Sequence, residues 1–162
     1  AQVATGKKIM LHTYCPTETP RHQLNLLKEV GVDMNNVSVG HIPETTDMDF
    51  VKWIYDQGVW LGIDRMPIIT LPGEYAVGTE TRIKSMLDEG MGDRMLFSHD
   101  IFSMSTLFDY QPEDILEYIG GICPEGFLFI KKRVFGKLAD MGVDPEYLWN
   151  LTIDNPKRFF EG

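Results

Sequence analysis

The sequence lacks both an excess of positive charge and any long apolar run. Its 162 residues include 15 lysines and arginines against 24 aspartates and glutamates, which gives a formal net charge of −9. Nucleic-acid binding depends on a basic surface that displaces counterions, so we expect no nucleic-acid partner. A helix needs about 20 consecutive apolar residues to cross a bilayer, and no run approaches that length, so we expect no membrane partner.

Cysteine is scarce as well. Cys15 and Cys123 are too few for a disulfide framework, and the first residues contain no long apolar core of a secretory leader. These absences predict a reducing, cytoplasmic location. The opening stretch AQVATG, residues 1–6, has the pattern of a helix end with Gly6 as its C-cap. We therefore expect that a segment preceding it has been lost from the chain.

The rest of the sequence alternates short apolar segments with segments of helical periodicity. A length of 162 residues corresponds to about one domain, so we expect residues 1–162 to form a single α/β unit. The expected strands are residues 7–12, 36–41, 59–64 and 94–100, and the expected helices are residues 17–32, 45–58, 78–90, 126–143, 144–153 and 154–162. Successive βα units predict a parallel sheet, either open and doubly wound or part of a (β/α)8 barrel, which needs about 250 residues.

The expected strands end in side chains that bind metals or move protons. His12 and His41 end the first two, Asp64 with Arg65 ends the third, and Asp100 ends the fourth. Ligands of parallel α/β folds bind at the carboxyl ends of the strands. Imidazole and carboxylate groups suit a divalent metal that activates water. The pattern therefore indicates a metal site at this end of the sheet.

Each of these residues also has a structural interpretation, because a single strand-end histidine more often has a structural role. Asp64 has two such alternatives: it caps the following loop, or it pairs with Arg65. His99 and Asp100 are neighbours and point to opposite faces of the strand, so only one faces the site. We expect Asp100 to face it, and His99 either to pack outward or to lie behind the residues that bind the metal. Glu44 and Asp47 are expected to be loop and cap residues.

Four segments resemble the phosphotriesterase-like branch of the amidohydrolase superfamily. ATGKKIMLHT (residues 4–13) is similar to that family's fifth strand, and residues 26–65 are similar to its sixth and seventh strands. RIKSMLDEGMGDRMLFSHD (residues 82–100) is similar to its helix and eighth strand, and NPKRFF (residues 155–160) to its closing helix. The resemblance implies strands 5–8 of a (β/α)8 TIM barrel, with the first half of the barrel absent.

The resemblance further implies a hydrolase with two divalent metals, zinc above all, with cobalt, manganese or iron as alternatives. His12 and His41 would bind the more exposed metal. Asp100 would bind the more buried metal and accept a proton from the attacking hydroxide, and Asp64 would pass that proton on. Arg65 would contact the substrate, and the loop from Ile101 to Pro124 would shape the leaving-group and acyl pocket. An arginine at this position is typical of the family's lactonase members, so the implied substrate is a lactone or a phosphoester.

The sequence also departs from the family. The first-strand His-x-His motif and the fourth-strand lysine are absent, so the chain carries three of the family's six usual ligands. The expected partner is a missing N-terminal half-barrel or a second copy of the chain, and the chain alone is expected to be inactive. The main alternative is a non-catalytic association module. A flavodoxin-like phosphate-binding domain is disfavoured, because HTYCPTETP (residues 12–20) is not a glycine-rich loop.

Overall fold

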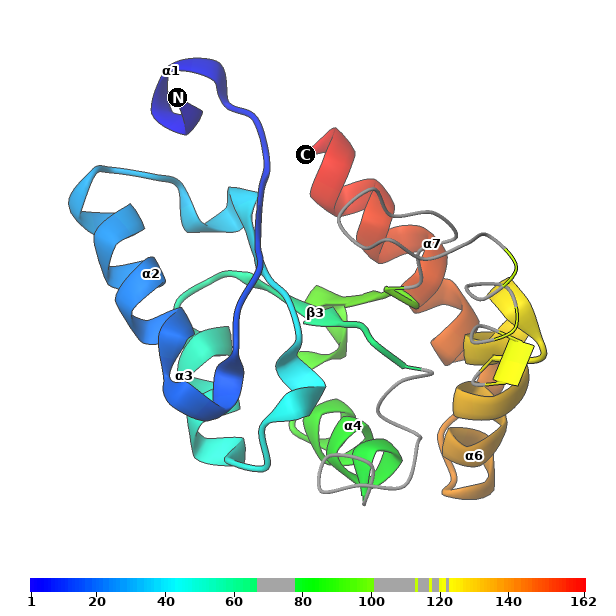
Figure 1. The fold of residues 1–162 in the computed structure, drawn as a ribbon. Helices are drawn as coiled ribbons and strands as arrows, with labels where there is room; N and C mark the ends of the chain where they lie inside the picture. Colours follow the sequence, from blue (N-terminus) through cyan, green and yellow to red (C-terminus); the bar gives the residue numbers. More distant parts are fainter. Residues whose placement is uncertain (67–77, 101–112, 114–116, 118–119, 122) are drawn as a thin grey trace.

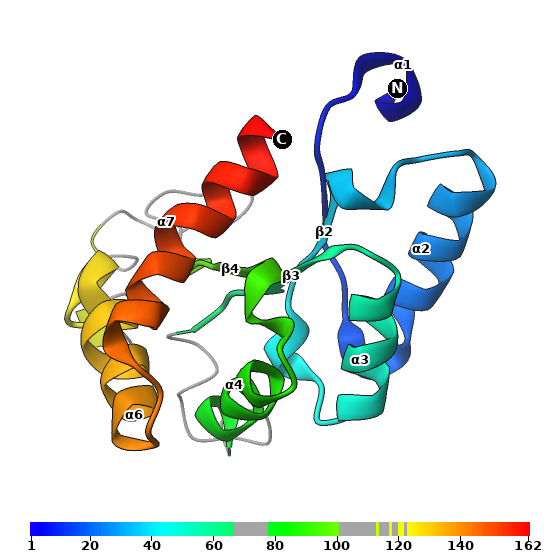
Figure 2. The same ribbon diagram turned by 180° about the vertical axis from the view of Figure 1, so that it is seen from behind.

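Four short parallel strands form the sheet of this protein. The computed structural model describes residues 1–66, 78–100, 113, 117, 120–121 and 123–162. The strands pair in the order of the chain (Figures 1 and 2): β1 (Ile9–Leu11), β2 (Val37–Val39), β3 (Trp60–Ile63) and β4 (Met95–Phe97). All three pairings are parallel, as successive βα units require, so the expected α/β class is confirmed.

Three helices follow the first three strands and cover one face of the sheet. They are α2 (Thr19–Glu29), α3 (Met48–Asp56) and α4 (Thr79–Asp88). Figure 2 shows these helices side by side, in the order α2, α3 and α4. Their apolar residues join those of the sheet in one buried cluster, which includes Leu24, Ile54, Leu61, Ile83 and Met95. The opposite face is covered only in part: Trp60 is buried against Phe159 of the C-terminal helix, whereas Met10 is exposed.

Short helical turns connect these elements and fix the chain at both ends of the sheet. They are η1 (Cys15–Thr17), η2 (Met34–Asn36), η3 (Ile42–Glu44) and η5 (Met91–Arg94). The side chain of Asp47 accepts a hydrogen bond from the backbone N–H of Phe50 and caps α3, as expected of this residue. The N-terminal α1 (Gln2–Thr5) ends at Gly6, whose φ of 64° confirms the expected C-cap.

The C-terminal region differs from the expectation of two short helices. After η6 (Gly126–Leu128), the π-helix η7 (Ile130–Val134) and α6 (Phe135–Asp140), one continuous helix, α7 (Pro145–Glu161), ends the chain. It contains Pro156, which lacks the N–H that a helix interior needs. Asn155 and Phe159 are buried on either side of this proline and hold the helix in one piece. The prediction of a boundary at residue 154 was therefore wrong.

Two further expectations concern the substrate-pocket loop and membrane-spanning helices. The loop expected to shape the substrate pocket, residues 101–124, lies largely outside the described residues. In the described part of the chain, no helix has the length and apolar character that a bilayer crossing requires.

Candidate functional site

The residues that follow β2, β3 and β4 share an unusual backbone conformation. His41, Arg65 and Asp100 have positive φ angles of 63°, 55° and 51°. Residues other than glycine rarely adopt this left-handed region, and such residues cluster at functional sites. All three lie just beyond the carboxyl ends of parallel strands, so the same turn geometry brings their side chains to one end of the sheet.

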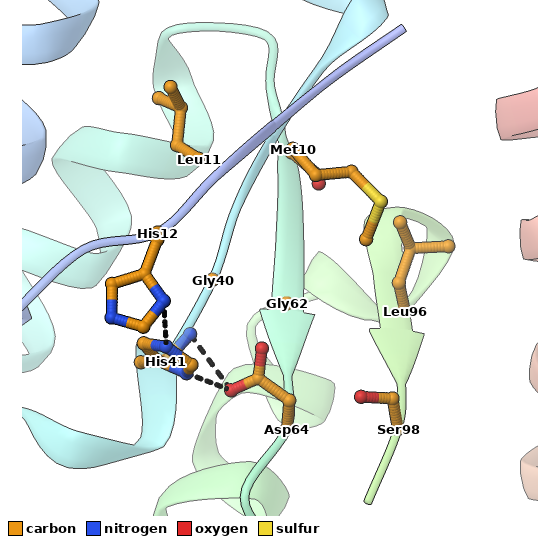
Figure 3. Close-up of a pocket in the computed structure, with 10 residues that line it drawn as sticks. Met10, Leu11, His12, Gly40, His41, Gly62, Asp64, Leu96 and Ser98 are labelled. Carbon is orange, nitrogen blue, oxygen red and sulfur yellow. Dashed lines mark hydrogen bonds and ion pairs between the residues drawn. The ribbon is translucent and has the colours of Figure 1, made fainter. Parts of the chain in front are cut away.

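Two histidines meet at this end of the sheet. Nε2 of His41 lies 3.2 Å from Nδ1 of His12, and the two rings are nearly perpendicular, with their centroids 4.5 Å apart (Figure 3). His41 is buried and His12 is exposed. The two histidines that end successive expected strands are thus neighbours in space, and one ring nitrogen of each points toward the other ring.

Asp64 fixes the orientation of His41. Its Oδ1 accepts hydrogen bonds from Nδ1 of the His41 ring, at 2.8 Å, and from the His41 backbone N–H, at 2.9 Å (Figure 3). A proton on Nδ1 leaves the lone pair of Nε2 directed at His12, the arrangement of metal-binding histidines. This hydrogen bond also raises the pKa of His41, against the lowering effect of burial. Asp64 thus pairs with His41 rather than with Arg65.

Arg65 joins two other carboxylates. Its Nη1 donates to Oε1 of Glu44 at 2.5 Å, and its Nε donates to Oδ2 of Asp100 at 2.9 Å. Burial lowers the pKa of Arg65, but the two hydrogen bonds raise it by more, so the guanidinium stays charged. The same Oδ2 of Asp100 lies 4.0 Å from Nδ1 of His41. Asp100 therefore lies on the Nδ1 side of the His41 ring.

Glu44 is the site residue that sequence reasoning missed. It was expected to be a loop or cap residue, but it is 8% exposed and forms an ion pair with Arg65. Its sequence context, two residues after the isoleucine that follows His41, carries no motif that distinguishes it from a turn residue. The signal that identifies it is its burial, which sequence alone does not give.

Glycines form the floor beneath the histidines. A Cβ atom on Gly40 would lie 2.9 Å from the backbone oxygen of Leu11, and one on Gly62 would lie 2.9 Å from Cα of Gly40. Side chains at these positions would force the strands apart. Their absence, together with the small side chain of Ser38, leaves a cavity of about 210 Å³ whose rim includes His12, His41 and Asp64 (Figure 3).

The donor atoms fit part of a metal site. Among the described residues, no group of three or more His, Cys, Asp and Glu side chains is gathered closely enough to hold an ion. His12 and His41, however, place two nitrogens 3.2 Å apart. Two nitrogens about 2.0–2.1 Å from one tetrahedral zinc would lie about 3.3 Å apart. The distance therefore fits two ligands of one ion, and further ligands must come from elsewhere. Without an ion, the same contact is a hydrogen bond in which Nε2 of His41 accepts from the Nδ1–H of His12.

The other histidines and Cys123 take no part in these contacts, whereas the Sγ of Cys15 lies 3.9 Å from the backbone oxygen of Gly40. His22 is exposed on α2, and His99 contacts the ring of Phe127 and accepts a long hydrogen bond, 3.5 Å, from the N–H of Ile130. Burial lowers the pKa of His99. Cys15 and Cys123 are buried free thiols, as expected from their number.

Comparison with known proteins identifies the family of this chain. The sequence profile of the phosphotriesterase family matches residues 1–160, and the chain belongs to this family. It is 30% identical over 162 residues to the phosphotriesterase homology protein of Mycobacterium tuberculosis, and the match covers 99% of this chain and 47% of that protein. It is 28% identical over 162 residues to the aryldialkylphosphatase of Saccharolobus solfataricus, covering 99% of this chain and 49% of the relative.

A solved structure gives the same result. The phosphotriesterase from Mycobacterium tuberculosis superposes with a TM-score of 0.81 and 29% identity, over 96% of this chain and 46% of that one. The chain thus spans about half the length of the relatives it matches. The expected fold class, parallel βα repeats that form part of a TIM barrel, is confirmed, and so is the family resemblance.

Proposed function

We propose that residues 1–162 form one half-barrel of a metal-dependent hydrolase of the lactonase type, with His12 and His41 as metal ligands. The observation that carries this proposal is the convergence of His12 Nδ1 and His41 Nε2, with Asp64 orienting the second ring. Membership of the phosphotriesterase family and coverage of about half of its relatives support it.

The chain's residues have distinct tasks in this proposal. A bound divalent metal, zinc or alternatively cobalt, manganese or iron, supplies a hydroxide at neutral pH and polarises the electrophile. His12 and His41 hold the more exposed ion, and Asp100 binds the more buried one and takes up a proton from the attacking water. Asp64 keeps the His41 ring in its binding tautomer and passes that proton on.

The substrate in this proposal is a small lactone or phosphoester. Arg65 supports the lactonase assignment: its side chain is 27% exposed at the edge of the site, and its charge is shared between two carboxylates. A guanidinium whose charge is balanced by two carboxylates offers the substrate a planar polar surface rather than an unpaired cation. Such a surface suits an uncharged ester better than an anion.

The incomplete site requires a partner, which we propose to be the other half of the barrel, in the same protein or in a second copy of this chain. Within the described residues, β1 and β4 each pair on one side only, and Met10 on the cavity side of β1 is 70% exposed. Unpaired edges and exposed apolar side chains favour association. We also propose a reducing, cytoplasmic location, which the two free thiols support.

Zinc titration of the chain by isothermal calorimetry tests the ligand assignment. We expect wild-type chain to bind zinc and His41→Ala to lose at least about ten-fold in affinity, because one of the two converging nitrogens is removed. His22→Ala removes an exposed histidine from α2 and should leave the affinity unchanged. Equal affinity of wild type and His41→Ala would contradict the proposal.

A further inference from the structure

The turn η3, which follows His41, holds a residue with a strained backbone in place. His41 precedes the turn with a φ of 63°, and its backbone oxygen accepts a hydrogen bond from the N–H of Glu44 at 3.1 Å. On the sheet side, Oδ1 of Asp64 accepts the backbone N–H of His41. A residue other than glycine persists in this region of φ only where its surroundings determine it, so the contacts of η3 decide where His41 lies.

Arg82 of α4 holds the same turn from the helices. Its Nη2 donates to the backbone oxygen of Pro43, in the middle of η3, at 2.9 Å and to Oγ1 of Thr79 at 3.0 Å. Pro43 is buried and Arg82 is only 9% exposed, so water does not replace this donor easily. Asp64 after β3 and Arg82 from α4 therefore both hold the short segment from residue 41 to residue 43.

The charged side chain of Arg82 is present at a cost. Burial lowers the pKa of Arg82, because the charged form is less stable there than in water. An apolar side chain would avoid this cost, but it would take from the buried oxygen of Pro43 the donor that it has. Since the same Nη2 also binds Thr79, the first residue of α4, the arginine ties η3 to the first turn of that helix.

We propose that Arg82 is a positioning residue for His41: by binding the Pro43 oxygen it fixes η3 and keeps Nε2 of His41 directed at Nδ1 of His12. This inference rests on the proposed role of His41 as a metal ligand. Arg82 acts through the backbone of the turn and not as a ligand. Without it, the Pro43 carbonyl turns toward another donor, and the backbone that leads back to His41 moves with it.

Hydrogen exchange of the His41 amide in the metal-free chain, followed by NMR, tests this role. Arg94→Met is a matched control for Arg82→Met, because Nη1 of Arg94 also donates to a backbone oxygen, that of Gly58, at 2.7 Å, before the start of β3. Measured against the amides of β3, which report overall stability, exchange at His41 is expected to be about ten-fold faster in Arg82→Met. Arg94→Met should leave this ratio at its wild-type value. A wild-type ratio in Arg82→Met, or equal increases in both variants, would overturn the proposal.

Zinc affinity of the 162-residue chain, measured by calorimetry, connects the turn to the proposed ligand pair. We expect Arg82→Met to lower the affinity about ten-fold, as loss of residues that orient metal ligands does, because the His41 nitrogen no longer lies opposite that of His12. Arg94→Met should bind zinc as wild type does. Wild-type affinity in Arg82→Met, or the same loss in both variants, would contradict the positioning role.

Failure of the metal site and failure of the positioning role give different results. A wild-type chain without zinc affinity would contradict the proposed metal site, and exchange of the His41 amide would then decide the role of Arg82 by itself. If Arg82→Met does not fold, the wild-type chain provides the test, because coupling between two sites is reciprocal. Zinc is then expected to shift the Nη–H resonances of Arg82 and not those of Arg94. An unmoved Arg82, or equal shifts at both arginines, would overturn the proposal.

Discussion

Single residues at the strand ends determine how closely the groups of the site approach one another. Gly40, directly after β2, and Gly62, in β3, lie against each other beneath His41 and Asp64. The hydrogen bond of 2.8 Å between His41 and Asp64 spans these two strands, so it depends on a strand separation that a side chain at either glycine would disturb. The floor of the cavity thus supports the geometry of its rim.

Gly62→Ala tests this dependence. The new Cβ would lie 2.9 Å from both Cα of Gly40 and the backbone oxygen of Val39, so the strands must shift. We expect the free energy of unfolding, measured by urea denaturation, to fall by about 1–3 kcal/mol. Gly136→Ala is the control: nothing lies within 4 Å of its Cβ position in α6, and alanine there should be neutral or stabilising. Equal effects of the two changes would contradict the account.

Cys15 gives a prediction on pH dependence. Burial raises the pKa of this thiol from 9.0 to about 12 in the folded chain. Below pH 9 the thiol is neutral in both states, and its contribution to stability is complete. Above pH 9 it ionises in the unfolded chain first, so the free energy of unfolding should fall as pH rises towards 12. Urea titrations should show a steeper alkaline decline for wild type than for Cys15→Ala, and equal slopes would contradict the assignment.

At the scale of elements, α7 shows how tertiary contacts override a local signal. Nδ2 of Asn155 donates to the backbone oxygens of Gly92 and Met95, each at 2.7 Å, and joins the helix to the segment that enters β4. The neighbouring Pro156 marks a helix boundary when only the local sequence is considered. Asn155 reaches 63 residues back along the chain to Gly92, and this distant contact could not be predicted from the sequence around residue 155.

Asn155→Ala is expected to destabilise the chain by about 1–3 kcal/mol, because two buried carbonyl groups lose their donor. Asn150→Ala makes the same change at an exposed position of the same helix, where the expected effect is within about 0.5 kcal/mol. Thermal or urea denaturation of both variants measures the difference. Two similar destabilisations would contradict a specific role for the hydrogen bonds of Asn155, because alanine has the higher helix propensity at both positions.

Two physical regularities made much of the fold and part of the site predictable from the sequence. The strands and α2–α4 follow from local periodicity, and the meeting of His12 with His41 follows because parallel strands end at the same edge of the sheet. Glu44 was not predictable, since its partner Arg65 lies 21 residues later and both its burial and its ion pair arise only in the folded chain.

At the scale of the whole molecule, the described chain is an open sheet whose cavity side is only partly covered. β1 and β4 lie at its two edges, and the cavity side carries exposed or half-buried apolar residues, among them Met10 and Leu96. The phosphotriesterase from Mycobacterium tuberculosis aligns with it over 46% of its own length. An unpaired half of such a barrel is expected to cover this face by association.

Sedimentation velocity of the isolated chain over a range of concentrations tests this expectation. We expect reversible self-association that Met10→Lys weakens, because a charge replaces an apolar side chain that is 70% exposed on the cavity side. Leu26→Lys places the same charge on α2, at a position that is 60% exposed, and should have little effect. A monomer at all concentrations, or equal effects of both variants, would contradict the prediction.

The central claim is that His12 and His41 share one metal ion, and a zinc titration followed by NMR of the histidine rings tests it most directly. The chain has four histidines, so His22 and His99 serve as internal controls. The account predicts that the ring nitrogens His12 Nδ1 and His41 Nε2 shift together with a single affinity, while the rings of His22 and His99 do not follow the titration. A response at His22 as strong as at His41, or no response at His12 and His41, would contradict it.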